Sequence, residues 1–161
     1  MALAYSADAG SAVTTPEPLR SNYTRAAFSK LVSRESETVE RKTGTGHHPI
    51  QEAIVAFSNT EGGAIFVGVR DDGTVVGRKH DQGVDDKIHE AALSARDTGR
   101  YRVTEIDVEG TPIVAIVVER RVERFAQTSD GRVLVRRGGR NVTLFGADPL
   151  QVHLRTRSAP L

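Results

Sequence analysis

The residues best suited to chemistry are carboxylates crowded into one short segment. Glu35, Glu37 and Glu40 fall within six residues of each other, and their charges repel one another unless something positive compensates. A divalent cation would do so, and hard oxygen ligands suit Mg²⁺ or Mn²⁺. The alternative interpretation is a solvated acidic patch that pairs with the flanking cations Arg41 and Lys42.

A second candidate group is basic. The range 119–140 holds seven arginines against three carboxylates, and its most exposed part is predicted to be a tight loop at 137–141 after a strand over 133–136. Guanidinium forks match phosphate oxygens bidentately, and glycines let a polyanion approach the backbone. Such contacts would be blind to base sequence. The alternative is a plain arginine-laced surface hairpin. The candidate contact residues are Lys42, Arg132, Arg136, Arg137 and Arg140.

The loop 43–49 is a weaker candidate for holding an anion. It combines glycines, threonines and the start of a predicted helix, where free N–H groups attract phosphate. The G-x4-G-K-[ST] order of a nucleotide-binding P-loop is absent, so no ATP is expected. His47 and His48 are adjacent and do not have a ligand spacing on one helix face. Because the chain has no cysteine, no Cys/His zinc site is expected either.

Hydrophobic spacing predicts the elements that position these residues. Ile50, Ala53, Ile54 and Phe57 share one face of a helix in which Pro49 suits the first position. A buried strand over 64–69, a turn at 71–73 and a returning strand over 74–77 should follow. The remaining expected elements are a helix from Ser21 or Asn22 to about Val32, a strand over 38–42, a helix over 81–96, strands over 101–108 and 111–118, and a last helix from Asp148.

Three blocks in this order resemble one known family. They are the E-x4-E-R-K segment from Glu35, the stretch AFSNTEGGAIFVGVRDDGTVVG over 56–77, and DGRVLVRRGG over 130–139. Together they resemble the Schlafen AlbA-like domain, which occurs in many bacterial proteins and forms the lobes of the mammalian Schlafen core. The likeness runs from about residue 35 to about residue 146. It implies a single α/β (α+β) domain with a mixed, largely antiparallel sheet packed against helices.

The resemblance also implies a possible nuclease site. Some nuclease-active Schlafens are understood to use two glutamates in an E-x4-E arrangement and an aspartate just after the central strand. The matching positions are Glu35, Glu40 and Asp71, which would bind Mg²⁺ or Mn²⁺ and activate water as a metal-dependent endoribonuclease does. Two features weaken the match: the family phenylalanine is replaced by Arg41, and Asp71 equally suits the opening of a turn.

The expected function is nucleic-acid binding through the Arg-rich hairpin, with duplex DNA or structured RNA such as tRNA as the partner. Few aromatic residues lie nearby, which disfavours single-strand stacking. The alternatives are the metal-dependent endoribonuclease and a protein-interaction module that meets an acidic partner. By analogy with the two lobes of mammalian Schlafens, a one-lobe chain could build an equivalent groove as a homodimer.

The bounds of the chain agree with one soluble domain. It has 161 residues, a net charge of +1, and no apolar run long enough for a membrane span or a secretory signal. We therefore expect a cytoplasmic protein without membrane contact. Residues 21–157 are expected to form the domain. Residues 1–20, rich in Ala, Ser, Thr and Pro, should be a disordered tail and 158–161 a short one.

Overall fold

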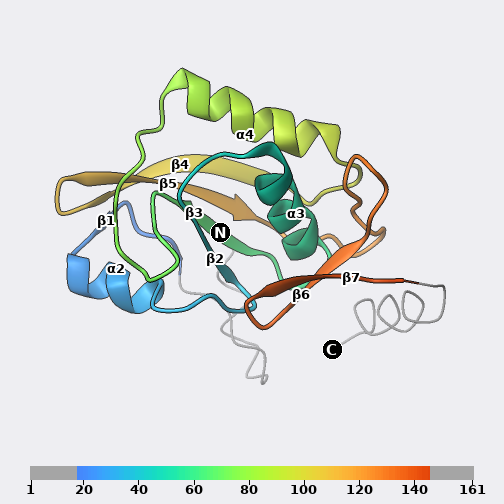
Figure 1. Cartoon of the computed structure of the whole chain (residues 1–161), viewed down its shortest axis with the longest axis horizontal. Coiled ribbons are helices and arrows are strands. Elements are labelled where there is room, and N and C mark those ends of the chain that lie inside the picture. Colours follow the sequence, from blue (N-terminus) through green and yellow to red (C-terminus); the bar gives the residue numbers. More distant parts are fainter. Residues whose placement is uncertain (1–17, 146–161) are drawn as a thin grey trace.

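The computed structural model describes residues 18–145 and arranges them in three layers (Figure 1). Helices α3 (His47–Ser58) and α4 (Gln82–Ser94) cover one face of a central sheet, and α2 (Arg25–Leu31) covers the other. The helix expected from Asp148 and both predicted tails lie outside the described residues, apart from residues 18–20.

The sheet is mixed, as the sequence predicted. Its five strands lie in the order β1-β4-β5-β3-β2. The long central pairings β4–β5 and β5–β3 are antiparallel, whereas β1 and β2 add in parallel at the two edges. A separate hairpin of β6 and β7 packs beside α3. The bounds are β1 Asn22–Tyr23, β2 Val39–Lys42, β3 Gly63–Val67, β4 Tyr101–Val108, β5 Thr111–Val118, β6 Leu134–Arg137 and β7 Arg140–Thr143.

Strand β3 lies between β5 and β2 and is buried on both faces, which explains its continuous apolar sequence. Ile65 and Val67 pack against α3 and α4. Phe66 points the other way, and its ring meets that of Phe28 in α2 edge-to-face with 5.4 Å between the centroids. Side chains alternate along a strand, so one short run supplies both halves of the core.

Two predicted boundaries were wrong for local reasons. Helix α2 begins only after Thr24, whose hydroxyl accepts a hydrogen bond from the N–H of Ala27 at 3.1 Å, because the preceding two residues pair with β4 as β1. The returning strand over 74–77 is reduced to one bridge between Val69 and Val75. Gly68 and Gly77 flank that bridge with φ of 112° and 91°, values that a regular strand does not have.

Helix α3 also starts earlier than predicted. It begins at His47, so Pro49 is its third residue, and its N-cap Gly46 offers no side-chain hydrogen bond.

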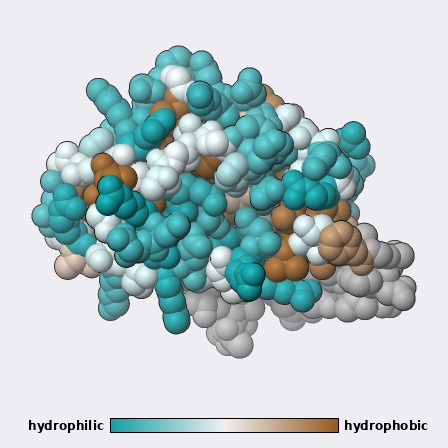
Figure 2. Space-filling view, viewed as in Figure 1, coloured by the Kyte–Doolittle hydropathy of each residue, from teal (hydrophilic) through white to brown (hydrophobic). Residues whose placement is uncertain are grey.

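None of the helices between residues 18 and 145 has the length and apolarity needed to cross a membrane. Figure 2 shows a largely hydrophilic face on which hydrophobic side chains gather over β6 and β7.

Candidate functional site

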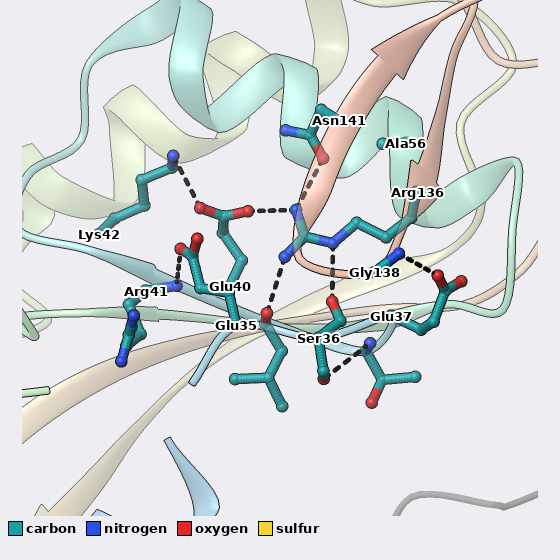
Figure 3. A network of polar contacts seen from close by, with 12 residues as sticks. Glu35, Ser36, Glu37, Glu40, Arg41, Lys42, Ala56, Arg136, Gly138 and Asn141 are labelled. Carbon is teal, nitrogen blue, oxygen red and sulfur yellow. Dashed lines mark hydrogen bonds and ion pairs between the residues drawn. The ribbon is translucent and has the colours of Figure 1, made fainter. Parts of the chain in front are cut away.

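Arg136 in β6 lies in the interior of the protein. Its side chain has no exposed area, and its guanidinium carbon lies 4.9 Å from the centre of the Phe57 ring. Its N–H groups meet four acceptors (Figure 3): a Glu40 oxygen, Asn141 Oδ1 at 2.8 Å, the Val39 carbonyl at 2.8 Å and the Ser36 carbonyl at 2.9 Å. Arg136 therefore joins β6 to the segment around β2 and is not the surface cation that the sequence suggested.

Glu40 is the buried partner of this arginine. The carboxylate is 5% exposed, with Oε1 against Arg136 and Oε2 2.9 Å from Lys42 Nζ. Glu40 and Lys42 share one face of β2, as the strand alternation predicted. Cations of the protein itself therefore contact both carboxylate oxygens, and the Lys42 ammonium is already paired with Glu40.

Glu35 lies beside Glu40 (Figure 3). One of its oxygens accepts the backbone N–H of Arg41 at 3.0 Å. Partial burial, followed by a hydrogen bond with Glu40, raises the pKa of Glu35 above its ordinary 4.5. Burial alone would raise the pKa of Glu40 too, but the hydrogen bond with Glu35 and the adjacent Lys42 and Arg136 together lower it. The two carboxyl groups therefore ionise unequally, and Glu35 is the one that resists a negative charge.

The raised pKa of Glu35 gives a pH-dependent prediction. Glu35→Gln should raise the free energy of unfolding at neutral pH by up to about 1 kcal/mol, because an uncharged amide removes the repulsion from Glu40. A raised folded-state pKa contributes stability below the unfolded value and loses it as the pH rises through the folded value. The gain should therefore vanish below about pH 4.5.

Urea unfolding across this pH range would measure the effect, with Glu61→Gln at an exposed position as the matched control. A Glu35→Gln variant that is less stable than the wild type at neutral pH would contradict the assignment.

Asp71, the third predicted carboxylate, is not gathered with the other two. It is exposed in the turn after β3, where Asp72 and not Asp71 accepts the N–H of Thr74 at 2.8 Å. Within residues 18–145, no three His, Cys, Asp or Glu side chains are placed to hold a metal ion together. The structure thus brings Glu35 and Glu40 together without the third ligand that the resemblance implied.

Arg41 has a structural task at the position where the family pattern has phenylalanine. Its Nη1 donates to the carbonyls of Val32 and Ser33 at 3.0 and 3.1 Å. These carbonyls follow the last turn of α2, where a cation is favourable. Arg41 points away from Glu40 across the strand (Figure 3), so it does not compete for the carboxylate pair.

Arg137 and Arg140 are the exposed cations of the predicted set. They face each other across the two-residue turn of the β6–β7 hairpin. No hydrogen bond or ion pair holds either guanidinium within residues 18–145. Both are therefore available to a ligand in a way that Arg136 is not.

Arg132, by comparison, is partly exposed and already forms ion pairs with two carboxylates. Its Nη2 lies 2.8 Å from Glu52 Oε2 and its Nε 3.0 Å from Asp130 Oδ2, at 35% side-chain exposure. A polyanion would have to compete with two carboxylates for this guanidinium. Of the five predicted basic contacts, only Arg137 and Arg140 are thus both exposed and unpaired in the described structure.

The turn between these two arginines is held against the segment before β2. The Gly138 N–H donates to a Glu37 carboxylate oxygen (Figure 3). A side chain on Gly139 would come within 2.9 Å of the Glu35 backbone, so this position needs glycine. The exposed Arg34 precedes that contact directly and also has no described partner. We call Arg34, Arg137 and Arg140 the hairpin surface.

Asn59, the C-cap residue of α3, anchors the chain that leads into the hairpin. Its fully buried amide donates to the carbonyls of Ala126 and Leu134 at 3.0 and 2.8 Å and accepts the Ala126 N–H at 2.7 Å. One side chain thus fixes the chain entering β6. The only sequence signal was a lone amide beside glycines, which is also typical of an ordinary C-cap.

Comparisons with known proteins bear on the fold and the family. The chain is similar to the crystal structure of the DIP2311 protein from Corynebacterium diphtheriae, with 20% identity and a TM-score of 0.59 over 76% of this chain and 28% of that one. At 20% identity this supports the fold alone, and the chain spans under a third of that protein.

A second similarity is to the solution structure of the N-terminal domain of a putative ATP-dependent DNA helicase RecG-related protein from Nitrosomonas europaea. The identity is 19% and the TM-score 0.43, over 71% of this chain and 82% of that one; this likeness is too distant to bear on the fold.

No curated protein matches the chain. The family model described as Schlafen, AlbA_2 matches residues 35–144, which is more than half of the sequence and includes the carboxylate pair and the β6–β7 hairpin. The chain therefore belongs to the Schlafen AlbA_2 family.

Proposed function

We propose that this protein binds the phosphate backbone of nucleic acid through the hairpin surface. The observation that carries the proposal is a pair of exposed guanidinium groups, Arg137 and Arg140, which have no partner within residues 18–145 and lie on the two strands that flank one short turn. Arginine forks bind phosphate oxygens bidentately. Membership of the AlbA_2 family agrees with a nucleic-acid partner.

The hydrogen bonds that support the hairpin favour binding, because the backbone that carries Arg137 and Arg140 is already fixed. Arg136 and Asn59 tie β6 to the body of the domain through buried hydrogen bonds. Binding loses affinity when loops must be immobilised, so a preorganised turn preserves more of each phosphate contact. The carboxylate of Glu37, which lies at the same turn, accepts the Gly138 N–H.

The chemistry of the surface points to a sequence-blind contact with duplex DNA or structured RNA such as tRNA. Backbone contacts position a protein without reading bases. Within residues 18–145, Phe145 just beyond β7 is the exposed phenylalanine, so the surface offers little for base stacking. We propose binding without cleavage, since Glu40 already uses both oxygens for Lys42 and Arg136.

A binding titration with two double variants would test the proposal. Arg137→Gln with Arg140→Gln should weaken binding to duplex DNA and to tRNA roughly tenfold or more, because two charge-assisted phosphate contacts are lost. The matched control is Lys79→Gln with Arg102→Gln, which removes two exposed charges near β4 and should leave the affinity within about threefold.

Equal loss in both double variants would show that net charge, and not this surface, governs binding. Absence of binding by the wild type would refute the proposal and favour the protein-interaction alternative. The same samples with Mn²⁺ or EDTA would report any cutting, and metal-dependent cutting lost in Glu40→Ala would contradict the limit to binding.

A further inference from the structure

A pocket of about 330 Å³ opens where α3 begins, away from the carboxylate pair and the hairpin surface. Thr45, Gly46 and His47 line it from the start of α3, and Lys87 and Glu90 line it from α4. The proposed nucleic-acid contact does not use these residues. The pocket therefore has to be considered for a ligand of its own.

The backbone at this end of α3 offers free donors. The first intrahelical bond runs from Ile50 N–H to the Gly46 carbonyl at 3.1 Å, and Gly46 caps the helix without a side-chain bond. The N–H groups of His47 and His48 thus have no intrahelical acceptor. With the positive end of the helix dipole they favour an anion.

Thr45 is the independent observation that points to a ligand. The residue is only 8% exposed, yet its hydroxyl has no hydrogen-bond partner within residues 18–145. Among the described residues, the side-chain atoms that are shut off from solvent and lack a hydrogen bond all belong to arginines, so the Thr45 hydroxyl is not one of them. The Thr45 hydroxyl therefore keeps access to solvent, and the pocket that Thr45 lines is where it can find an acceptor. Because so little of Thr45 is exposed and the residue lines the pocket, an acceptor bound in the pocket is the partner that this hydroxyl can reach.

The side chains around the pocket include one cation and one carboxylate. The Lys87 ammonium is exposed and has no described ion pair, so it is free to turn inward. His47 is oriented by a 3.2 Å contact between its Nε2 and Ser94 Oγ. The Glu90 carboxylate opposes an anion, but it lies one turn from Lys87 on α4, where the two can pair.

We propose that this pocket binds a phosphate group, held by the Thr45 hydroxyl, the N–H groups of His47 and His48 and the Lys87 ammonium. The ligand class is a phosphate monoester, either free or at the end of a nucleic acid. This pocket site is independent of the hairpin surface, because the two share no residue.

Titration of the isotope-labelled full chain with inorganic phosphate would test the site by NMR. Saturable shifts are expected at the amides of His47 and His48, and Thr45→Val should weaken phosphate binding roughly tenfold, the loss of one hydrogen bond to a charged group. Lys87→Gln should weaken it several-fold. Thr45→Ser, which keeps the hydroxyl, and Lys30→Gln on α2 should titrate like the wild type, as should Arg137→Gln with Arg140→Gln.

Two oligonucleotides of one sequence, with and without a 5′-phosphate, would separate the sources. Tighter binding of the phosphorylated strand that is lost in Thr45→Val would identify a nucleic-acid end as the ligand. Equal binding of both strands, with the phosphate shifts retained, would identify free phosphate. Absent or unsaturable shifts at His47 and His48, or wild-type phosphate affinity in Thr45→Val, would overturn the proposal.

Discussion

Replacing Arg136 by alanine is expected to lower the free energy of unfolding by about 3–5 kcal/mol, the loss typical when one member of a buried ion pair is removed. The variant would leave the Glu40 carboxylate, which is 5% exposed, with Lys42 as its remaining cationic partner among the described residues. It would also leave the carbonyls of Ser36 and Val39 without their guanidinium donors. Urea unfolding followed by circular dichroism would measure the change.

The neighbouring Arg137 provides the control for this experiment. Arg137→Ala removes the same side chain from an exposed, unpaired position and should change stability by less than about 0.5 kcal/mol. A double-mutant cycle between Arg136→Ala and Glu40→Gln should return a coupling free energy of at least about 1 kcal/mol. Equal stability of Arg136→Ala and Arg137→Ala would contradict the structural role of Arg136.

Asn59→Ala should destabilise the protein by about 2–4 kcal/mol, since it leaves two carbonyls and one N–H unsatisfied in a fully buried site. The chain between Ala126 and Leu134 would lose its anchor, so the hairpin should loosen before the rest of the domain. Hydrogen exchange at the amides of β6 and β7 would then rise more than exchange in β4 and β5.

Asn22→Ala tests whether loss of an amide is costly in itself. Asn22 is exposed and contacts only Ser21 through its side-chain amide, at 3.2 Å, so its loss should cost less than about 0.5 kcal/mol. If Asn59→Ala were no more destabilising than Asn22→Ala, or if exchange rose evenly across the sheet, Asn59 would not be the anchor.

Elements set by local patterns could be predicted from the sequence. The strands over 101–108 and 111–118 were located to the residue, because each alternates or runs apolar between clear turn signals. The shared face of Glu40 and Lys42 followed from the two-residue period of a strand. Turn chemistry likewise placed the reversal at 71–73, where the Gly73 N–H donates to the Arg70 carbonyl at 2.8 Å.

The candidate site could not be predicted in the same way, because its key contacts join distant segments. Arg136 and Glu40 are 96 residues apart, and no local spacing records their pairing. Period-two alternation also fails in β6, where Leu134, Val135 and Arg136 are all buried, because the strand packs between α3 and the segment around β2. Sequence reasoning therefore found the arginine cluster and the exposed Arg137 and Arg140, but it missed that Arg136 is buried.

The most direct test of the nucleic-acid contact is the salt dependence of duplex DNA binding by the wild type and by Arg137→Gln with Arg140→Gln. Each neutralised phosphate contributes about 0.9 to the slope of log K against log salt concentration. If both arginines contact phosphates, the slope of the double variant should be shallower by about 2. An unchanged slope and affinity would contradict a backbone contact at the hairpin surface.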